Sequence, residues 1–183
     1  MAEAYLELGS NLGDREAYLA RALEALSEWP DITIRRTSRV YRSSAWGVLE
    51  QPDFLNLCVQ IDTELDPFDL LQACKMVEVE LGRQERARWG PREIDVDILM
   101  MDDVDIETPG LTIPHARLSQ RRFVLEPLAE IAPDREFDGL TISRLADALR
   151  EDAPEQVCEV DPDATAHVEE LLRRGAGITT EQT

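Results

Sequence analysis

The sequence has little positive charge, few aromatic residues and few cysteines. Its 19 Lys and Arg residues stand against 38 Asp and Glu residues, which gives a formal net charge of −19. A field of that sign repels nucleic-acid phosphates and anionic lipid headgroups, so we expect neither a nucleic-acid partner nor a membrane partner. Hydrophobic residues still make up 43% of the chain and aromatic residues 5%, which predicts a folded protein with an acidic surface.

The cysteines show no pattern of a disulfide-rich or zinc-binding protein. Cys58, Cys74 and Cys158 are odd in number and far apart, which excludes a disulfide framework and a zinc cage. The sequence also lacks a long apolar run and a cationic leader followed by an apolar stretch. We therefore expect a cytoplasmic protein. Its 183 residues suffice for one domain and a modest appendage, and we expect a monomer, with weak self-association as the alternative.

The usual glycine-rich phosphate loops are missing as well. The chain has neither Gly-x-x-x-x-Gly-Lys-Ser/Thr nor Gly-x-Gly-x-x-Gly, and residues 9–13 match neither spacing. A P-loop kinase and a dinucleotide-dependent dehydrogenase are therefore disfavoured.

What the chain does contain is a regular alternation of strand and helix patterns. Apolar spacing predicts strands over residues 4–8, 32–41, 54–65 and 94–101, and helices over 14–29 and 66–81. Asp14 and Asp66 have the residue type and position of helix N-caps. The order β, α, β, β, α, β predicts a ferredoxin-like α+β sandwich, in which helices pack on one face of an antiparallel sheet.

The remainder of the chain divides into a short helix and an acidic extension. We expect a helix over residues 123–131 that Pro127 interrupts, because proline lacks the amide donor. The expected core domain covers residues 1–140, and residues 141–183 form a C-terminal extension that is partly helical with a frayed end.

A cluster of arginines precedes two aspartates. Residues 83–92 contain four arginines and one glutamate, a local net charge of +3. Asp95 and Asp97 then follow two positions apart on a predicted strand, so their carboxylates project from the same face. Paired carboxylates suit Mg²⁺ and arginines suit phosphate oxygens, a combination that favours phosphoryl or pyrophosphoryl transfer from a nucleotide. The alternative is a solvated strand face beside arginines that neutralise an acidic surface.

Aromatic residues and a histidine give two further signals. Four aromatic side chains lie in or near predicted loops, where they can stack on a flat heteroaromatic ring: Trp46, Phe54, Trp89 and Phe123. Asn56 shares a strand face with Phe54 and can hydrogen-bond the edge of such a ring. The alternative for Phe54 and Phe123 is a place in the core. His115 is followed by several arginines, which favours contact with phosphate or ribose, the alternative being a structural histidine.

Four motifs in this order are similar to one known family. They are residues 8–14 (LGSNLGD), 51–56 (QPDFLN), 88–99 (RWGPREIDVDIL), and the stretch from 113–115 (IPH) through Arg121 and Phe123 to 127–133 (PLAEIAP). Together they resemble the 6-hydroxymethyl-7,8-dihydropterin pyrophosphokinases of folate biosynthesis, over about residues 4–138. The resemblance implies a ferredoxin-like fold and an enzyme that transfers diphosphate from ATP to the pterin hydroxymethyl group and releases AMP.

The resemblance also implies roles for individual residues. Two Mg²⁺ ions would bind Asp95 and Asp97, which with Arg83 and Arg92 would be catalytic. The implied ATP-binding residues are Glu78, Arg83, Arg88, Arg92, Ile98, Thr112, His115 and Arg121. The implied pterin-binding residues are Ser43, Ser44, Trp46, Phe54, Asn56, Trp89, Asp95 and Phe123.

Two positions depart from the family pattern. Glu85 stands where a second arginine is usual and Arg86 follows it, which leaves Arg83, Arg86 and Arg88 as alternatives for the arginine that reaches the phosphates. Ala45 stands where proline is common. The alternative function is a non-catalytic ferredoxin-like module that binds a ligand or regulates a partner.

Overall fold

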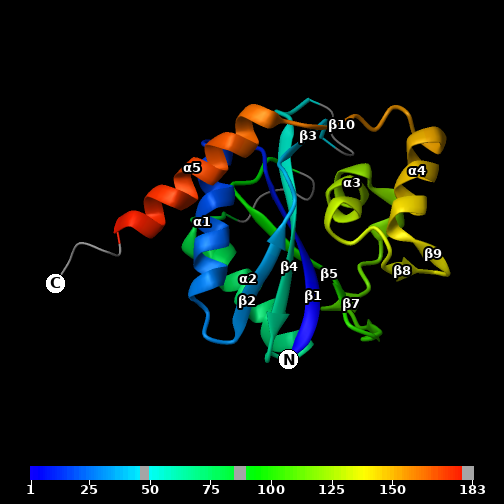
Figure 1. Cartoon of the computed structure of the whole chain (residues 1–183), viewed down its shortest axis with the longest axis horizontal. Coiled ribbons are helices and arrows are strands. Elements are labelled where there is room, and N and C mark those ends of the chain that lie inside the picture. Colours follow the sequence, from blue (N-terminus) through cyan, green and yellow to red (C-terminus); the bar gives the residue numbers. More distant parts are fainter. Residues whose placement is uncertain (46–49, 85–89, 179–183) are drawn as a thin grey trace.

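A six-stranded antiparallel sheet forms the centre of the molecule (Figure 1). The computed structural model describes residues 1–45, 50–84 and 90–178, with no side-chain description for 176–178. The strands run in the order β10-β3-β4-β1-β5, and β2 also pairs with β4. Their bounds are β1 Ala2–Ser10, β2 Ile32–Thr37, β3 Tyr41–Ser43, β4 Phe54–Thr63, β5 Asp95–Met101 and β10 Cys158–Val160.

Five α-helices cover the sheet in the part of the chain that the structure describes. They are α1 Arg15–Glu28, α2 Pro67–Glu80, α3 Arg122–Ile131, α4 Ile142–Asp152 and α5 Pro162–Ile178. Both predicted N-caps are confirmed, since the Asp14 carboxylate accepts from the Ala17 amide and the Asp66 carboxylate accepts from the amides of Phe68 and Asp69. Short elements connect them: β6 Ile106–Glu107, β7 Thr112–Ile113, the 3₁₀ helix Leu118–Gln120, β8 Glu136–Phe137 and β9 Leu140–Thr141.

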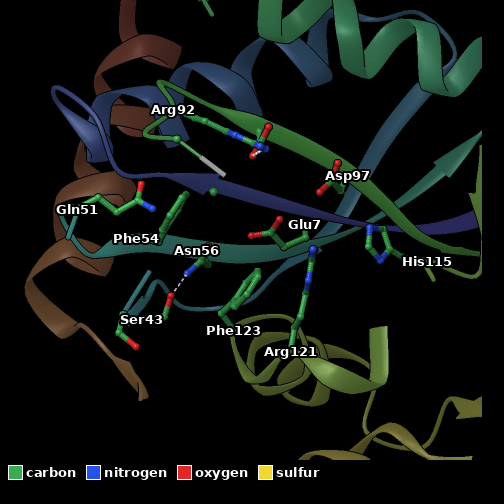
Figure 2. A pocket seen from close by; sticks show the side chains of 14 residues that line it. Glu7, Ser43, Gln51, Phe54, Asn56, Arg92, Asp97, His115, Arg121 and Phe123 are labelled. Atoms are coloured by element: carbon green, nitrogen blue, oxygen red, sulfur yellow. Dashed lines mark hydrogen bonds and ion pairs between the residues drawn. The ribbon is translucent and has the colours of Figure 1, made fainter. Parts of the chain in front are cut away.

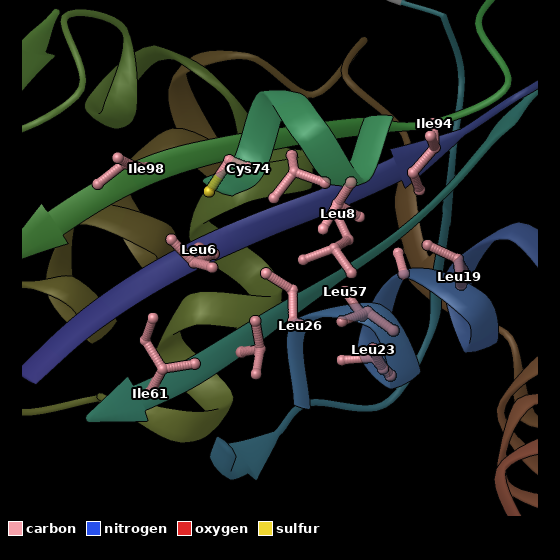
Figure 3. Close-up of a cluster of buried hydrophobic side chains, with 14 of the residues drawn as sticks. Leu6, Leu8, Leu19, Leu23, Leu26, Leu57, Ile61, Cys74, Ile94 and Ile98 are labelled. Atoms are coloured by element: carbon pink, nitrogen blue, oxygen red, sulfur yellow. The ribbon is translucent and has the colours of Figure 1, made fainter. Parts of the chain in front are cut away.

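The sheet buries apolar side chains on both faces. On one face, alternate residues of the central strands, such as Leu6, Leu8 and Leu57, pack against α1 and α2 (Figure 3). On the other face, a smaller cluster including Cys58, Leu99 and Leu128 lies under α3 and α4. The two helices of the predicted core, α1 and α2, lie on one face as expected, and the later helices α3 and α4 cover the second face.

Two predicted elements differ in detail from the structure. The strand expected over residues 32–41 is divided into β2 and β3, because the Ser38 hydroxyl replaces a backbone carbonyl and accepts from the Cys58 amide at 3.0 Å. Pro127 does not interrupt α3, which continues from Arg122 to Ile131 with the proline inside.

The C-terminal segment joins the rest of the fold at two places. Strand β10 pairs with β3, so that Cys158 lies opposite Ser43. Helix α5 packs against α1, and its Ala164 and Val168 side chains belong to the main core. None of the helices in the described residues combines the length and the apolar character needed to cross a bilayer.

Candidate active site

One cavity lies on the sheet face that carries α3, beyond the edge of the apolar cluster (Figure 2). Strand alternation explains its position: Leu6 and Leu8 of β1 point to the main core, whereas Glu7 and Gly9 point into the cavity. The cavity is open to solvent and has an empty volume of about 700 Å³, including its mouth. Its lining comes from β1, β3, β4, β5 and the segments around His115 and Phe123.

Two phenylalanines provide the aromatic surface of this cavity. Phe54 begins β4 and Phe123 lies in the first turn of α3, so both predicted ring-binding residues line the same space. Between them, the Asn56 side-chain amide donates to the Ser43 hydroxyl at 2.8 Å. The Asn56 Oδ1 atom is buried and has no hydrogen-bond partner among the residues that the structure describes. The arrangement suits a flat ring that stacks on phenylalanine and donates hydrogen bonds at its edge.

Asp95 lies at the other end of the cavity between two arginines. Its Oδ1 atom is 2.7 Å from Arg83 Nη1, and its second oxygen pairs with Arg92. Beneath this pair, the Glu78 carboxylate is buried and pairs with Arg83 and Lys75, and it accepts from the Val96 amide at 2.8 Å. Glu78 therefore fixes the position of Arg83.

The loop after β1 connects three segments around the site. The Asn11 Oδ1 atom accepts from the Arg92 amide at 2.8 Å, and the Asn11 amide donates back to the Arg92 carbonyl at 3.1 Å. The Asn11 side-chain amide also donates to Gln51 Oε1 and the Pro52 carbonyl. The LGSNLGD motif thus positions the segment before Asp95 and the segment before Phe54.

Burial and mutual repulsion change the pKa values of the carboxylates in the cavity. Burial raises the pKa of Asp95, the Asp97 charge raises it further, and Arg92 and Arg83 oppose the shift. The pKa of Glu7 lies well above its usual range, first because of burial and then because of Asp97 and Asp95. These carboxylates crowd one face of the sheet, so an added cation is favoured there.

His115 is oriented toward the cavity as a neutral imidazole. Burial lowers the pKa of this histidine, and the Arg117 amide donates to its Nδ1 atom at 3.1 Å. With Nδ1 as acceptor, the proton of the neutral ring lies on Nε2, which can donate to a phosphate oxygen.

Most of the predicted site residues that the structure describes lie together. Ten of them line the cavity: Ser43, Ser44, Phe54, Asn56, Arg92, Asp95, Asp97, His115, Arg121 and Phe123. Arg83 reaches it through Asp95. Trp46, Arg88 and Trp89 lie outside the described residues, as does Glu85.

Besides Arg83, three predicted nucleotide-binding residues are not part of the described cavity lining. Glu78 lies behind Arg83, the Ile98 side chain belongs to the main core, and Thr112 pairs with β6. The sequence interpretation also missed Glu7 and Gln51, which do line the cavity. Strand alternation could have found Glu7, since Glu7 lies two residues before Gly9 on the same face of β1.

The fold and the cavity define an α+β transferase with paired carboxylates, arginines and two aromatic rings in one cavity. A family model described as 7,8-dihydro-6-hydroxymethylpterin-pyrophosphokinase matches residues 5–133. The 2-amino-4-hydroxy-6-hydroxymethyldihydropteridine pyrophosphokinase of Methylorubrum extorquens is 43% identical over 169 residues, which cover 92% of this chain and 100% of the relative. The Bacillus subtilis enzyme of the same name is 46% identical over 80% of this chain and 88% of its own length.

Solved structures agree on the fold. A crystal structure of an HPPK-DHPS protein with substrates matches with a TM-score of 0.67 and 15% identity, covering 84% of this chain and 44% of that one. A Plasmodium falciparum HPPK-DHPS structure matches with a TM-score of 0.63 and 18% identity, covering 83% of this chain and 44% of that one. This chain thus spans less than half the length of those two-part proteins.

The chain belongs to the 7,8-dihydro-6-hydroxymethylpterin pyrophosphokinase family. It is an ATP-dependent diphosphotransferase of folate biosynthesis.

Proposed function

We propose that the cavity described above binds both substrates and is the site of diphosphate transfer. The observation that carries this proposal is the presence, in one cavity, of two phenylalanines and of Asp95 and Asp97 beside arginines. The pterin ring stacks between Phe54 and Phe123, with Asn56 at its edge. The ATP phosphates lie toward Asp95, Arg92 and the His115 side of the cavity.

Two Mg²⁺ ions fit the donor set of this site. Among the described residues, no three histidine, cysteine or carboxylate side chains converge as a metal site on their own. Asp95 and Asp97 would therefore supply the protein ligands, and phosphate oxygens and water the others, as Mg²⁺ prefers. Bound there, the ions would neutralise phosphate charge and polarise the phosphorus that is attacked.

The protein side chains orient the reactants and stabilise the charge that develops. The hydroxymethyl oxygen forms a bond to the β-phosphorus while the bond from that phosphorus to the oxygen shared with the α-phosphorus breaks. The hydroxyl proton is released and AMP leaves. Arg83 and Arg92 pair with Asp95 in the structure. During transfer these two arginines donate to phosphate oxygens, as do Arg121 and His115.

We also propose a catalytic unit over residues 1–140 that acts as a monomer in the cytoplasm. The family match ends at residue 133, and one chain supplies the described cavity lining. The three cysteines are free and buried, which is compatible with a reducing compartment. The residues from 141 to 183 support this unit through β10 and α5.

Product analysis of aspartate variants tests the site. With ATP, Mg²⁺ and 6-hydroxymethyl-7,8-dihydropterin, the native chain should form one AMP per pterin diphosphate and no ADP. We expect Asp95→Asn and Asp97→Asn each to lower kcat by about 100-fold or more, because each removes a charge that the transition state needs. Asp103→Asn, at an exposed position, is the matched control and should keep native kcat. Native kcat in both cavity variants would refute the site.

A further inference from the structure

Glu7 is a buried carboxylate without an assigned role. It lies in the middle of β1, opposite Cys58 of β4 and Asp97 of β5, and only 4% of its surface is exposed. Its side chain points into the cavity, between Asn56 and Arg121 in Figure 2. Within the described residues, the Glu7 Oε1 atom has no hydrogen-bond partner. Buried polar atoms nearly always have one, so this oxygen is expected to gain a donor from a ligand.

The missing side chain of Gly9 shows where such a donor would lie. A Cβ atom on Gly9 would be 2.8 Å from Asn56 Oδ1, 3.0 Å from Glu7 Oε1 and 3.7 Å from the Phe54 ring. Two buried acceptor oxygens, both without a partner in residues 1–45, 50–84 and 90–178, thus border the same small space beside an aromatic ring. Any residue larger than glycine would reduce this space. It fits a flat molecule that stacks on Phe54 and donates more than one hydrogen bond.

The missing donor at Glu7 distinguishes between the phosphates of ATP and the pterin. Phosphate oxygens are hydrogen-bond acceptors, so they cannot supply the donor that Oε1 lacks. A pterin is neutral and has ring N–H groups and a hydroxymethyl O–H group, which are donors. Oε1 borders the same space as Asn56 Oδ1 and the Phe54 ring, so the pterin is the substrate whose donors can reach it.

We propose that Glu7 is a pterin-binding residue of this chain, whose carboxylate accepts a hydrogen bond from the pterin beside the one that Asn56 accepts. This inference rests on the proposed site, because it requires the ring to lie between Phe54 and Phe123. The two acceptors for the pterin then come from two strands, Glu7 from β1 and Asn56 from β4.

Equilibrium binding tests the role of Glu7 without turnover. The dissociation constant of 6-hydroxymethyl-7,8-dihydropterin is measured by calorimetry with Mg²⁺ and saturating α,β-methylene ATP present. Glu7→Met, which keeps the length but has no acceptor oxygen, should weaken pterin binding about 10- to 100-fold. Glu7→Gln, which keeps an acceptor, should weaken it less. The affinity for α,β-methylene ATP alone should not fall in either variant.

Two controls separate the possible results. Glu3→Met makes the same change on the same face of β1, where Glu3 bonds Tyr5 and Gln60 away from the cavity, and should leave pterin affinity unchanged. 6-Methyl-7,8-dihydropterin lacks the hydroxyl: an equal loss with both ligands assigns the donor to a ring N–H, and a loss confined to the hydroxymethyl ligand assigns it to the hydroxyl. Either result supports the proposal.

The proposal is overturned if folded Glu7→Met binds the pterin within twofold of the native chain, or if it loses affinity for the nucleotide instead. If Glu7→Met does not fold, Glu7→Gln is measured in its place, and loss of nucleotide affinity in that variant would also reject the proposal. Failure of the proposed site is recognised separately, because substitution of Phe54 or Phe123 would then leave the pterin affinity unchanged.

Discussion

Glu126 lies outside the cavity and stabilises its wall through two ion pairs. This side chain is 8% exposed and pairs with Arg122, which precedes Phe123, and with Arg150 of α4. Burial alone would raise the pKa of Glu126, but the hydrogen bonds from Arg150 and Arg122 lower it below its usual value. A carboxylate with a lowered pKa stabilises the fold in its ionised form.

The stability of a Glu126→Gln variant should therefore depend on pH. Because the folded pKa lies below the unfolded one, the contribution of Glu126 is present above the unfolded pKa of about 4.5 and is lost as the pH falls through the folded value. We expect the variant to lose about 1–3 kcal/mol of unfolding free energy at pH 7, and less below about pH 4. Urea denaturation across this range measures the difference.

Asp147→Asn is the control for this comparison. Asp147 pairs with the same Arg150, but its side chain is 69% exposed, so its loss should cost less than about 1 kcal/mol at any pH. A Glu126→Gln loss that is equally large at pH 4 and pH 7 would show that packing, rather than ionisation, carries the effect.

Single residues also show what the sequence can and cannot predict. Asp95 and Asp97 were predictable, because two-residue spacing on a strand places both carboxylates on one face. The pairing of Arg83 with both Glu78 and Asp95 was not, since it depends on how the end of α2 lies against β5. The missing donor for Glu7 became visible only from the neighbours that surround it.

Among the elements, the long helices and central strands were predictable and the short ones were not. Helices α1 and α2 have caps at Asp14 and Asp66 and several turns of apolar spacing. Strand β10 has three residues, and the β6–β7 and β8–β9 pairs have two residues per strand, which is too short for a period. Strand β10 pairs with β3 of the main sheet, whereas β6 pairs with β7 and β8 with β9 in separate two-stranded sheets.

Gln156 and Val157, just before β10, contact two segments that line the cavity. The Gln156 side chain accepts from the Arg122 amide at 3.0 Å and donates to the Gln120 carbonyl at 3.1 Å. The next residue, Val157, accepts from the Ser44 amide at 3.3 Å. One short segment of the C-terminal extension therefore fixes the backbone beside Phe123 and beside Ser44.

A Gln156→Ala variant should weaken pterin binding more than it slows chemistry. Loss of two side-chain hydrogen bonds leaves the start of α3 less constrained, so we expect the pterin KM to rise about 3- to 10-fold with a smaller change in kcat. Gln72→Ala, at an exposed position of α2, is the matched control. A fall in kcat with no change in the pterin KM would contradict this role.

In the molecule as a whole, one face of the sheet carries the main apolar core and the other carries the cavity. The face under α1 and α2 is apolar along its length, whereas the opposite face is apolar only under α3 and α4. The rest of that face carries Glu7, Asp95 and Asp97 in the cavity. In a chain of net charge −19, arginines 83 and 92 pair with Asp95 at this site, where phosphates are expected to bind.

A crystal structure of the chain with α,β-methylene ATP, Mg²⁺ and 6-hydroxymethyl-7,8-dihydropterin tests the central claim most directly. The account predicts the pterin ring between Phe54 and Phe123, and metal ions in contact with both Asp95 and Asp97. A ring bound elsewhere on the molecule, or phosphates bound while Asp95 keeps only its pairs with Arg83 and Arg92, would contradict it.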